Sequence, residues 1–339
     1  MADKSKSTSK PVAARPQADD PADNANMQLE TDNTIEKDES DMKDLSQFDV
    51  IKAIINGYGE SGTDALKNDT RTIITKYLKQ IAIKNEVTKK YNVLILYDNT
   101  SLVKGDADNI YNAVTNFIKD KPLLLVLYSS GGLAGSAYLI GKLCREYSNG
   151  KFITTVPRHA KSAATLICCA ANEIHMGSLS ELGPIDPQID GLPALGLKNS
   201  IEHIAELVKA NPESTDMFAK YLNSSLTLIN LGYYERVAES AMQYAEKLLN
   251  THSENLPKAS KDIAEELVYR YKDHGFVIDK YEAEQIFGDK IIKTNSPEYE
   301  LGNDLYRALD FIRNWVGYFK KNFYLIGSLD TEPSIIDIR

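Results

Sequence analysis

Two turns rich in glycine and serine carry residue types that could attack a carbonyl group. The first turn, Ser129-Ser130-Gly131-Gly132, directly follows the apolar run 122–128. The second turn follows the apolar residues 152–156 and ends at Ser162, where an apolar segment of small residues begins. A serine hydroxyl can act as a nucleophile, and glycine turns leave backbone amides uncovered for an oxyanion. If this chain performs chemistry, we expect it at these turns.

Three interpretations of the turns compete. In the first, Ser162 is only an N-cap, a position that serine favours because its hydroxyl accepts from the unpaired amides of the first helical turn. In the second, the glycines of the first turn bind a dinucleotide, but Pro157-Arg158 stands where that motif requires an acidic residue. In the third, Ser162 is a nucleophile, and the amides of Gly131 or Gly132 and of Ala163 form an oxyanion hole.

The apolar runs that precede the turns indicate buried parallel strands. Continuous apolar residues without polar alternation are typical of strands that are covered on both faces. We expect strands at 92–97, 122–128 and 152–156, and helices at 106–119, 134–147 and 162–171. This alternation predicts an α/β fold built from right-handed parallel units.

Four sequence blocks resemble one known family. The blocks are Ser129-Ser130-Gly131-Gly132, residues 160–166, residues 170–174 and Leu182-Gly183-Pro184-Ile185-Asp186-Pro187-Gln188. They resemble the ClpP/crotonase-like fold and, within it, the serine dehydrogenase proteinases, which are relatives of signal peptide peptidase A. The resemblance implies a spiral of β-β-α units with a helical C-terminal elaboration. It also implies that Ser162 is the nucleophile and that amides of the two turns form its oxyanion hole.

The resemblance leaves the general base open. A serine needs a base to take its proton, but the position at which Clp proteases carry a histidine falls within 183–186, where no histidine stands. Relatives of signal peptide peptidase A use a lysine farther along the chain, because burial can make a lysine a base. The corresponding window contains Lys209, with Lys198 just before it and Lys220 just after it. Lys209 is therefore the predicted base.

Other polar residues near the serine have less direct roles. Lys161 adjoins Ser162, which suits orientation or substrate contact better than proton transfer. Asp186 either orients the base or shapes its turn. We expect His175 to be structural or exposed, because strand alternation alone decides which face it occupies. His159 is close to the serine in sequence, but neighbours on a turn usually point apart.

Composition divides the chain into four expected parts. Residues 1–44 are polar and poor in large apolar side chains, which predicts a disordered tail. Residues 45–91 show helical periodicity, residues 92–293 form the ClpP/crotonase-like peptidase domain, and residues 294–339 form a helical extension. The segment His274-Gly275-Phe276-Val277-Ile278 resembles the closing segment of the family. No strand is expected after residue 188, and helices are expected there at 201–210, 215–224, 227–250, 258–273 and 303–320.

Length, composition and charge limit the kinds of function that this chain could have. The 339 residues are 42% apolar, which suffices for one large domain or two small ones, and the formal charge of −9 argues against a nucleic-acid surface. The three cysteines show neither disulfide nor zinc spacing, so a reducing compartment is expected. Neither a secretory leader nor an apolar run long enough to cross a bilayer stands out. We therefore expect a cytoplasmic protein with no membrane or nucleic-acid partner, no cofactor and no metal.

The leading hypothesis is a cytoplasmic serine peptidase that hydrolyses peptide bonds in a peptide or protein substrate. Its expected site consists of Ser162, Lys209 and Asp186 as catalytic residues and of Gly131, Gly132 and Ala163 as the oxyanion hole. A homo-oligomer is also expected, because related proteins use the helices after the core to pack subunits. One alternative is an inactive scaffold of the same fold that binds peptides or proteins. Another is a crotonase-like acyl-thioester enzyme, which uses the same kind of oxyanion hole without a serine.

Overall fold

The computed structural model describes residues 44–189, 192–225 and 228–338. Residues 45–339 form one compact unit. Nearly all of the predicted disordered tail, residues 1–44, lies outside the described residues. The domain boundaries predicted after residues 91 and 293 remain predictions.

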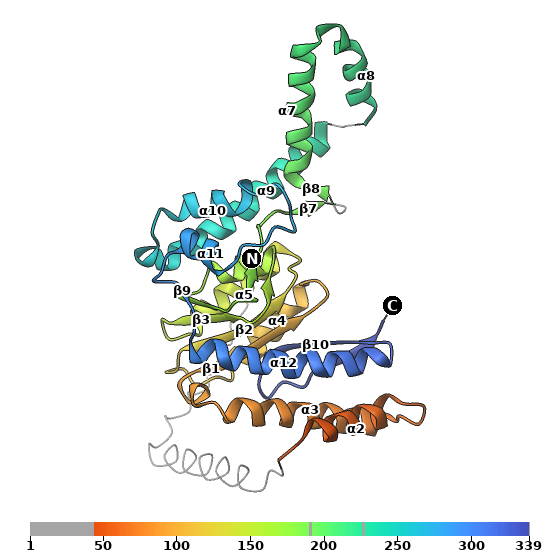
Figure 1. Ribbon diagram of the computed structural model, residues 1–339, viewed down its shortest axis with the longest axis vertical. Helices are drawn as coiled ribbons and strands as arrows, with labels where there is room; N and C mark the ends of the chain where they lie inside the picture. The colour runs from red at the N-terminus through yellow and green to blue at the C-terminus, as the bar shows by residue number, and fades with distance from the viewer. Residues whose placement is uncertain (1–43, 190–191, 226–227, 339) are drawn as a thin grey trace, which may run out of the picture. The chain divides into compact units, whose positions relative to one another are not determined.

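A mixed sheet forms the centre of this unit (Figure 1). Its strands are β1 Asn92–Asp98, β2 Leu123–Ser129, β3 Phe152–Val156, β4 His159–Ala160, β5 Glu173–Met176, β6 Glu181–Leu182, β9 Ile292–Lys293, β10 Lys321–Ser328 and β11 Ser334–Asp337. The main order is β11-β10-β1-β2-β3-β5-β9, and β4 pairs with both β2 and β6. Strands β1, β2, β3, β5 and β9 are parallel to one another, whereas β10 is antiparallel to β1 and to β11. A separate antiparallel pair consists of β7 Gln188–Ile189 and β8 Leu192–Pro193.

The continuous apolar runs arise because both faces of the sheet are covered. In β1, Leu94 and Leu96 join a core cluster on one face, whereas Ile95 and Tyr97 join a second cluster on the other face. Successive side chains of a strand point to opposite faces, so a strand covered on both sides is apolar throughout. The predicted α/β class with parallel strands is confirmed.

Helices supply the cover on each face. The described α-helices are α2 Gln47–Tyr58, α3 Asp64–Ile83, α4 Lys104–Val114, α5 Ala134–Glu146, α6 Ala163–Cys168, α7 Ala194–Ala210, α8 Thr215–Ser225, α9 Leu228–Leu249, α10 Ser260–Tyr269, α11 Lys280–Phe287 and α12 Pro297–Tyr318, of which α7 and α8 project away from the sheet in Figure 1. Helices α4, α5, α6, α9, α10 and α11 contribute to the cluster that contains Leu94. Helices α2, α3 and α12 contribute to the cluster that contains Ile95, and Figure 1 shows α12 along the sheet with α2 and α3 beyond it. None of these described helices has the length and apolar composition needed to span a bilayer.

The C-terminal part departs from the expectation in one respect. The helices expected after residue 188 are present, but β8, β9, β10 and β11 also follow that residue. Lys320, with φ of 55°, turns the chain after α12, and β10 then pairs with β1 so that Ile326 lies opposite Leu96. The segment 294–339 is therefore helical only as far as Tyr318. A short apolar run such as 323–326 does not reveal its partner strand, because periodicity cannot separate a short strand from a helix.

Candidate active site

Ser162 has a backbone conformation that serine rarely adopts. Its φ is 53° and its ψ is −120°, at the position directly before α6. A non-glycine residue in such a region costs about 1–3 kcal/mol and is found mainly at active sites and switches. Ser162 occupies the N-cap position, but its side chain makes no capping hydrogen bond. The N-cap interpretation therefore does not explain this serine, and the sharp strand-to-helix turn matches the geometry that presents a nucleophile.

Hydrogen bonds on both sides hold this strained turn in place. The Lys161 amide donates to the Ser129 carbonyl over 3.0 Å, which ties the turn to the end of β2. The Ala164 amide donates to the Lys161 carbonyl over 2.9 Å. The Thr165 hydroxyl donates to the Ala160 carbonyl over 2.7 Å, within the buried base of the turn. The sheet and the helix together impose the conformation of the serine between them.

The glycine turn lies directly against the serine turn. Gly131 has φ of 99°, and a Cβ atom added there would lie 2.6 Å from the Lys161 carbonyl oxygen and 2.9 Å from the Ser162 Cβ. Gly132 has φ of 146°, and a Cβ there would lie 2.3 Å from the Leu102 amide nitrogen. Both positions therefore require glycine, because any side chain would collide with backbone. The two turns that the sequence singles out form one site.

One of the three amides predicted for the oxyanion hole already has an acceptor. The Gly131 amide donates to the Ser129 hydroxyl over 3.1 Å, so it already has an acceptor. Across the part of the chain that the structure describes, the amides of Gly132 and Ala163 have no recorded acceptor. An amide next to a nucleophile and without an acceptor is suited to the negative oxygen of a tetrahedral intermediate. The amides of Gly132 and Ala163 are therefore better suited to an oxyanion hole than the Gly131 amide is.

A cleft of about 500 Å³ opens over Ser162. Both turns contribute to its walls, together with the segment after β6, a loop before α11 and one side of α9. The apolar lining includes Leu133, Ile185 and Val237. The cleft also contains the side chain of His274, which the sequence analysis placed only in the closing segment of the family.

His274 faces a buried carboxylate. The distance from His274 Nδ1 to Asp186 Oδ2 is 3.7 Å, and the Asp186 side chain is only 7% exposed. Asp186 Oδ2 also accepts a hydrogen bond of 3.2 Å from Gln188 Nε2. Among the described residues, Asp186 Oδ1 and His274 Nδ1 are buried atoms without a hydrogen-bond partner. The structure thus places Ser162 and His274 on one cleft and the buried Asp186 next to His274.

Three backbone connections bring these segments together. Leu182 and Ile278 exchange hydrogen bonds of 2.9 and 3.0 Å between their amides and carbonyls. The Ile185 amide donates to the Leu267 carbonyl over 2.9 Å, which anchors the Asp186 segment on α10. The Gly183 amide donates to the Thr165 hydroxyl of the serine helix over 3.1 Å. These contacts join segments that are far apart in sequence, so no local pattern predicts the pairing of His274 with Asp186.

The lysines considered as bases lie on helices, and Lys161 lies beside the serine. Lys209 is exposed at the end of α7 and does not belong to the lining of the cleft, so its role as a base remains a prediction. Lys198 also lies on α7, and Lys220 forms an exposed ion pair with Asp216. Lys161 lies beside the serine, where its Nζ is 3.0 Å from Glu181 Oε2.

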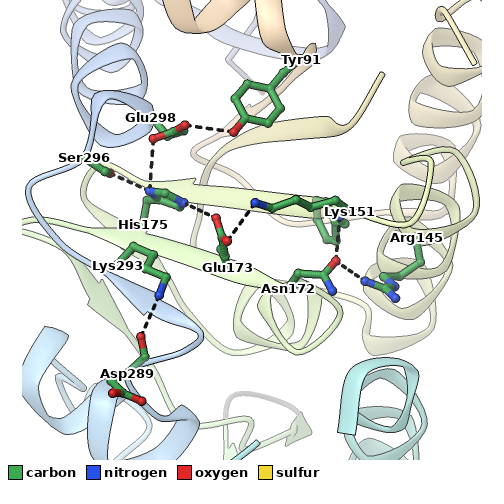
Figure 2. A network of polar contacts seen from close by, with 11 residues as sticks. Tyr91, Arg145, Lys151, Asn172, Glu173, His175, Asp289, Lys293, Ser296 and Glu298 are labelled. Carbon is green, nitrogen blue, oxygen red and sulfur yellow. Dashed lines mark hydrogen bonds and ion pairs between the residues drawn. The ribbon is translucent and has the colours of Figure 1, made fainter. Parts of the chain in front are cut away.

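Two other histidines, His159 and His175, lie on strands of the sheet and have polar partners of their own. His159 Nε2 is 3.2 Å from the exposed Ser130 hydroxyl, and burial lowers the pKa of His159. His175 is buried in a polar network shown in Figure 2, with Nδ1 2.6 Å from the Ser296 hydroxyl and Nε2 3.3 Å from Glu173 Oε2. The hydrogen bond from His175, with help from Lys151, lowers the pKa of Glu173 to about 2. This network connects β5 to the start of α12.

Comparison with known families gives the site its context. A model of the ClpP-like SDH-type serine proteinases matches residues 93–298, which is more than half of the chain. The chain belongs to this family. Members are serine-type peptidases, so the resemblance seen in the four sequence blocks is confirmed. The matched range of the proteinase contains Ser162, Asp186 and His274.

Two proteins of Methanocaldococcus jannaschii are similar to part of the proteinase. Uncharacterized protein MJ0137 is 35% identical over 97 residues, which are 29% of this chain and 34% of that protein. Uncharacterized protein MJ1495 is 34% identical over 92 residues, which are 27% of this chain and 31% of that protein. The alignments thus span about a third of the length of these curated relatives.

Two solved structures show a remote likeness to the proteinase. One is a serine-to-alanine mutant of the 1510-N membrane-bound stomatin-specific protease, with a TM-score of 0.39 and 13% identity, covering 74% of this chain and 97% of that chain. The other is a lysine-to-alanine mutant of the same protease in complex with a substrate peptide, with a TM-score of 0.39, 13% identity and coverage of 73% and 88%. The family assignment therefore rests on the sequence match.

Proposed function

We propose that this chain hydrolyses peptide bonds through Ser162, with His274 as the general base and Asp186 as the carboxylate that orients it. The observation that carries this proposal is the strained Ser162 turn, which opens into the same cleft as His274, whose Nδ1 lies 3.7 Å from the buried Asp186. A serine, a histidine and a buried aspartate in this arrangement are the parts of a hydrolytic triad, which recurs on unrelated folds. In this proposal, His274 replaces Lys209 as the base.

The first half of the reaction forms an acyl-enzyme. His274 takes the proton from the Ser162 hydroxyl, and the oxygen attacks the carbonyl carbon of the substrate. The carbonyl oxygen becomes negative and accepts hydrogen bonds from the Gly132 and Ala163 amides. Asp186 holds the Nδ1 proton of His274 and stabilises the imidazolium. His274 then gives its proton to the leaving nitrogen, and the carbon–nitrogen bond breaks.

The second half releases the acyl group. His274 takes a proton from a water molecule, whose oxygen attacks the acyl carbon, and Ser162 recovers its proton when the ester bond breaks. The distance of 3.7 Å from His274 to Asp186 is longer than a hydrogen bond. Catalytic hydrogen bonds are often long without substrate and shorten in the reacting complex.

The setting in which the proteinase works is also part of the proposal. We infer a peptide or protein substrate, because the apolar cleft is lined by backbone amides that suit a carbonyl group. The described cysteines, Cys144, Cys168 and Cys169, are buried and unpaired. Unpaired cysteines and an acidic net charge of −9 favour a reducing, cytoplasmic setting. A homo-oligomer remains part of this proposal as well.

Labelling by a fluorophosphonate probe tests the catalytic residues. We expect the probe to modify Ser162 in the wild type, and mass spectrometry of the modified peptide identifies the site. Ser162→Ala should not label, and His274→Ala should label at least about 100-fold more slowly. His203→Ala is the matched control, because His203 is an exposed histidine of α7.

Two outcomes would contradict the proposal in different ways. If Lys209→Ala abolishes labelling while His274→Ala keeps it, Ser162 is the nucleophile but the base is misassigned. If the folded wild type does not label at all, the peptidase proposal loses its support, and a peptide-binding scaffold of the same fold takes its place.

A further inference from the structure

The side chain of Lys161 connects the serine turn to the loop that carries His274. Its Nζ donates to the Gly275 carbonyl over 3.2 Å and lies 3.0 Å from Glu181 Oε2. The side chains of Lys161 and Glu181 are only 19% and 28% exposed. The aliphatic part of Lys161 packs on Gly183, where an added Cβ would lie 3.0 Å from Lys161 Cδ. The ammonium group is therefore fixed at both its stem and its tip.

The loop at 273–277 has few other connections to the body of the protein. Its recorded backbone hydrogen bonds are local, from the Gly275 amide to Asp273 Oδ1 and from the Phe276 amide to the Asp273 carbonyl. Gly275, Phe276 and Val277 are exposed. The pairing of Ile278 with Leu182 anchors only the end of the loop. Among the described residues, Lys161 thus provides a direct link from this loop to the turn of Ser162.

We propose that Lys161 is a positioning residue for the base: it holds the Gly275 carbonyl and thereby keeps the ring of His274 in the cleft that Ser162 also lines. This inference rests on the proposed function. Lys161 does not take the serine proton in this arrangement. As an ammonium group it donates to a carbonyl and a carboxylate at once, whereas as a neutral base it would leave the half-buried Glu181 without its cation.

Loss of this link is expected to slow the chemical step more than substrate binding. A displacement of about 1 Å in a catalytic group can lower the rate about 100-fold. Lys161→Ala frees the Gly275 carbonyl but leaves the cleft lining unchanged, because Lys161 does not belong to it. We therefore expect the maximal labelling rate to fall about 10- to 100-fold, with the half-saturating probe concentration changing by less than about threefold.

The experiment measures labelling rates of the full chain against concentration of a fluorophosphonate probe. Lys161→Arg should restore the rate to within about fivefold of the wild type, because a guanidinium can donate to both acceptors. Lys151→Ala is the matched control, since Lys151 forms an ion pair of the same 3.0 Å length with Glu173 on another part of the sheet. This control should label at the wild-type rate.

A double variant decides whether Lys161 acts through His274. If it does, Lys161→Ala adds no further loss in a His274→Ala background, because effects of residues that act as a unit are not additive. An equal loss in both backgrounds, or a wild-type rate for Lys161→Ala, overturns the inference. If Lys161→Ala fails to fold, Glu181→Gln replaces it and should slow labelling about two- to tenfold, and a wild-type rate for that variant overturns the inference. If His274→Ala itself labels at the wild-type rate, the proposed function fails instead.

Discussion

The proteinase contains two histidines that face carboxylates, and their surroundings are opposite. His175 is 3% exposed, and both of its ring nitrogens have partners, Ser296 on one side and Glu173 on the other (Figure 2). His274 lies in a cleft, and its Nδ1 stands 3.7 Å from Asp186 with no hydrogen bond among the described residues. Buried polar groups are normally satisfied, so an unsatisfied pair requires an explanation.

Under the proposed function, this difference separates a structural histidine from a catalytic one. The His175 network joins β5 to the start of α12 around a buried histidine. The His274 pair shares its cleft with a strained serine and with two amides that have no recorded acceptor. Strain and unsatisfied polar groups weaken a fold, and they persist where function needs them. The comparison predicts that changes at the two histidines have opposite consequences.

The largest expected effect separates activity from stability. His274→Ala should lower peptidase and labelling rates by about 1,000-fold while the unfolding free energy changes by less than about 1 kcal/mol. His175→Ala should instead cost about 2–4 kcal/mol of stability, because it leaves Glu173 and Glu298 without their buried partner. Labelling kinetics and urea unfolding of both variants measure the two effects. The contrast between the two histidines would be wrong if His175→Ala abolished labelling while the protein kept its wild-type stability.

The second effect concerns the contact between the two turns. Gly131→Ala should destabilise the protein by about 2–4 kcal/mol and abolish labelling, because the added Cβ collides with backbone at a φ of 99°. Gly135→Ala is the matched control, since a Cβ at Gly135 meets nothing within 4 Å. Denaturant unfolding and labelling are measured for both. Equal stability of the two variants would show that the turns are not in contact.

The third effect depends on pH and belongs to the His175 network. Contacts with His175 and Lys151 hold the pKa of Glu173 at about 2, compared with an ordinary value of 4.5. A carboxylate whose folded pKa is depressed contributes stability above its unfolded pKa and loses it as pH falls toward the folded value. Glu173 should thus contribute about 1–3 kcal/mol at pH 7, and this contribution should disappear between about pH 4.5 and 2.

The difference in unfolding free energy between the wild type and Glu173→Gln measures this contribution. We expect the difference to shrink as pH is lowered from 7 to about 3. A difference that stays constant over that range would mean that the Glu173 charge does not stabilise the fold.

The smallest expected effect is a gain in stability at the serine itself. Ser162→Gly should raise the unfolding free energy by about 1 kcal/mol, because glycine adopts a φ of 53° without the strain of a side chain. The same variant loses the nucleophile and should not label. Ser162→Ala keeps the strain and serves as the comparison. If both variants are equally stable, the backbone of Ser162 is not strained.

Much of the fold could be predicted because its signals are local. The continuous apolar runs at β1 and β2 indicate strands buried on both faces, and the helical stripes after residue 188 indicate the described α-helices there except α11. The strand β10 was not expected, since its pairing with β1 joins segments at opposite ends of the proteinase domain. The partner of a short strand is a property of the tertiary structure.

The residues of the candidate site also fall into two groups: those that local sequence indicates and those that only the tertiary structure brings together. Sequence singles out Ser162, Gly131 and Gly132, because their residue types and their places after apolar runs are local features. It does not indicate His274 as a base, although the chain has only five histidines and this one lies in a family-like segment. His274 is one of the five possible histidine bases, but no local feature of the sequence ranks it above the others.

The sequence by itself thus determined the strands β1, β2 and β3, the positions of the two turns and of Ser162, and the resemblance to the family. Only the tertiary structure decided that the serine is strained, that Gly131 already has an acceptor, and that Asp186 faces His274. The reason is physical: periodicity and turn chemistry act over a few residues, whereas this histidine and aspartate meet through contacts of Leu182 with Ile278 and of Ile185 with Leu267. Such contacts form only when the whole core packs.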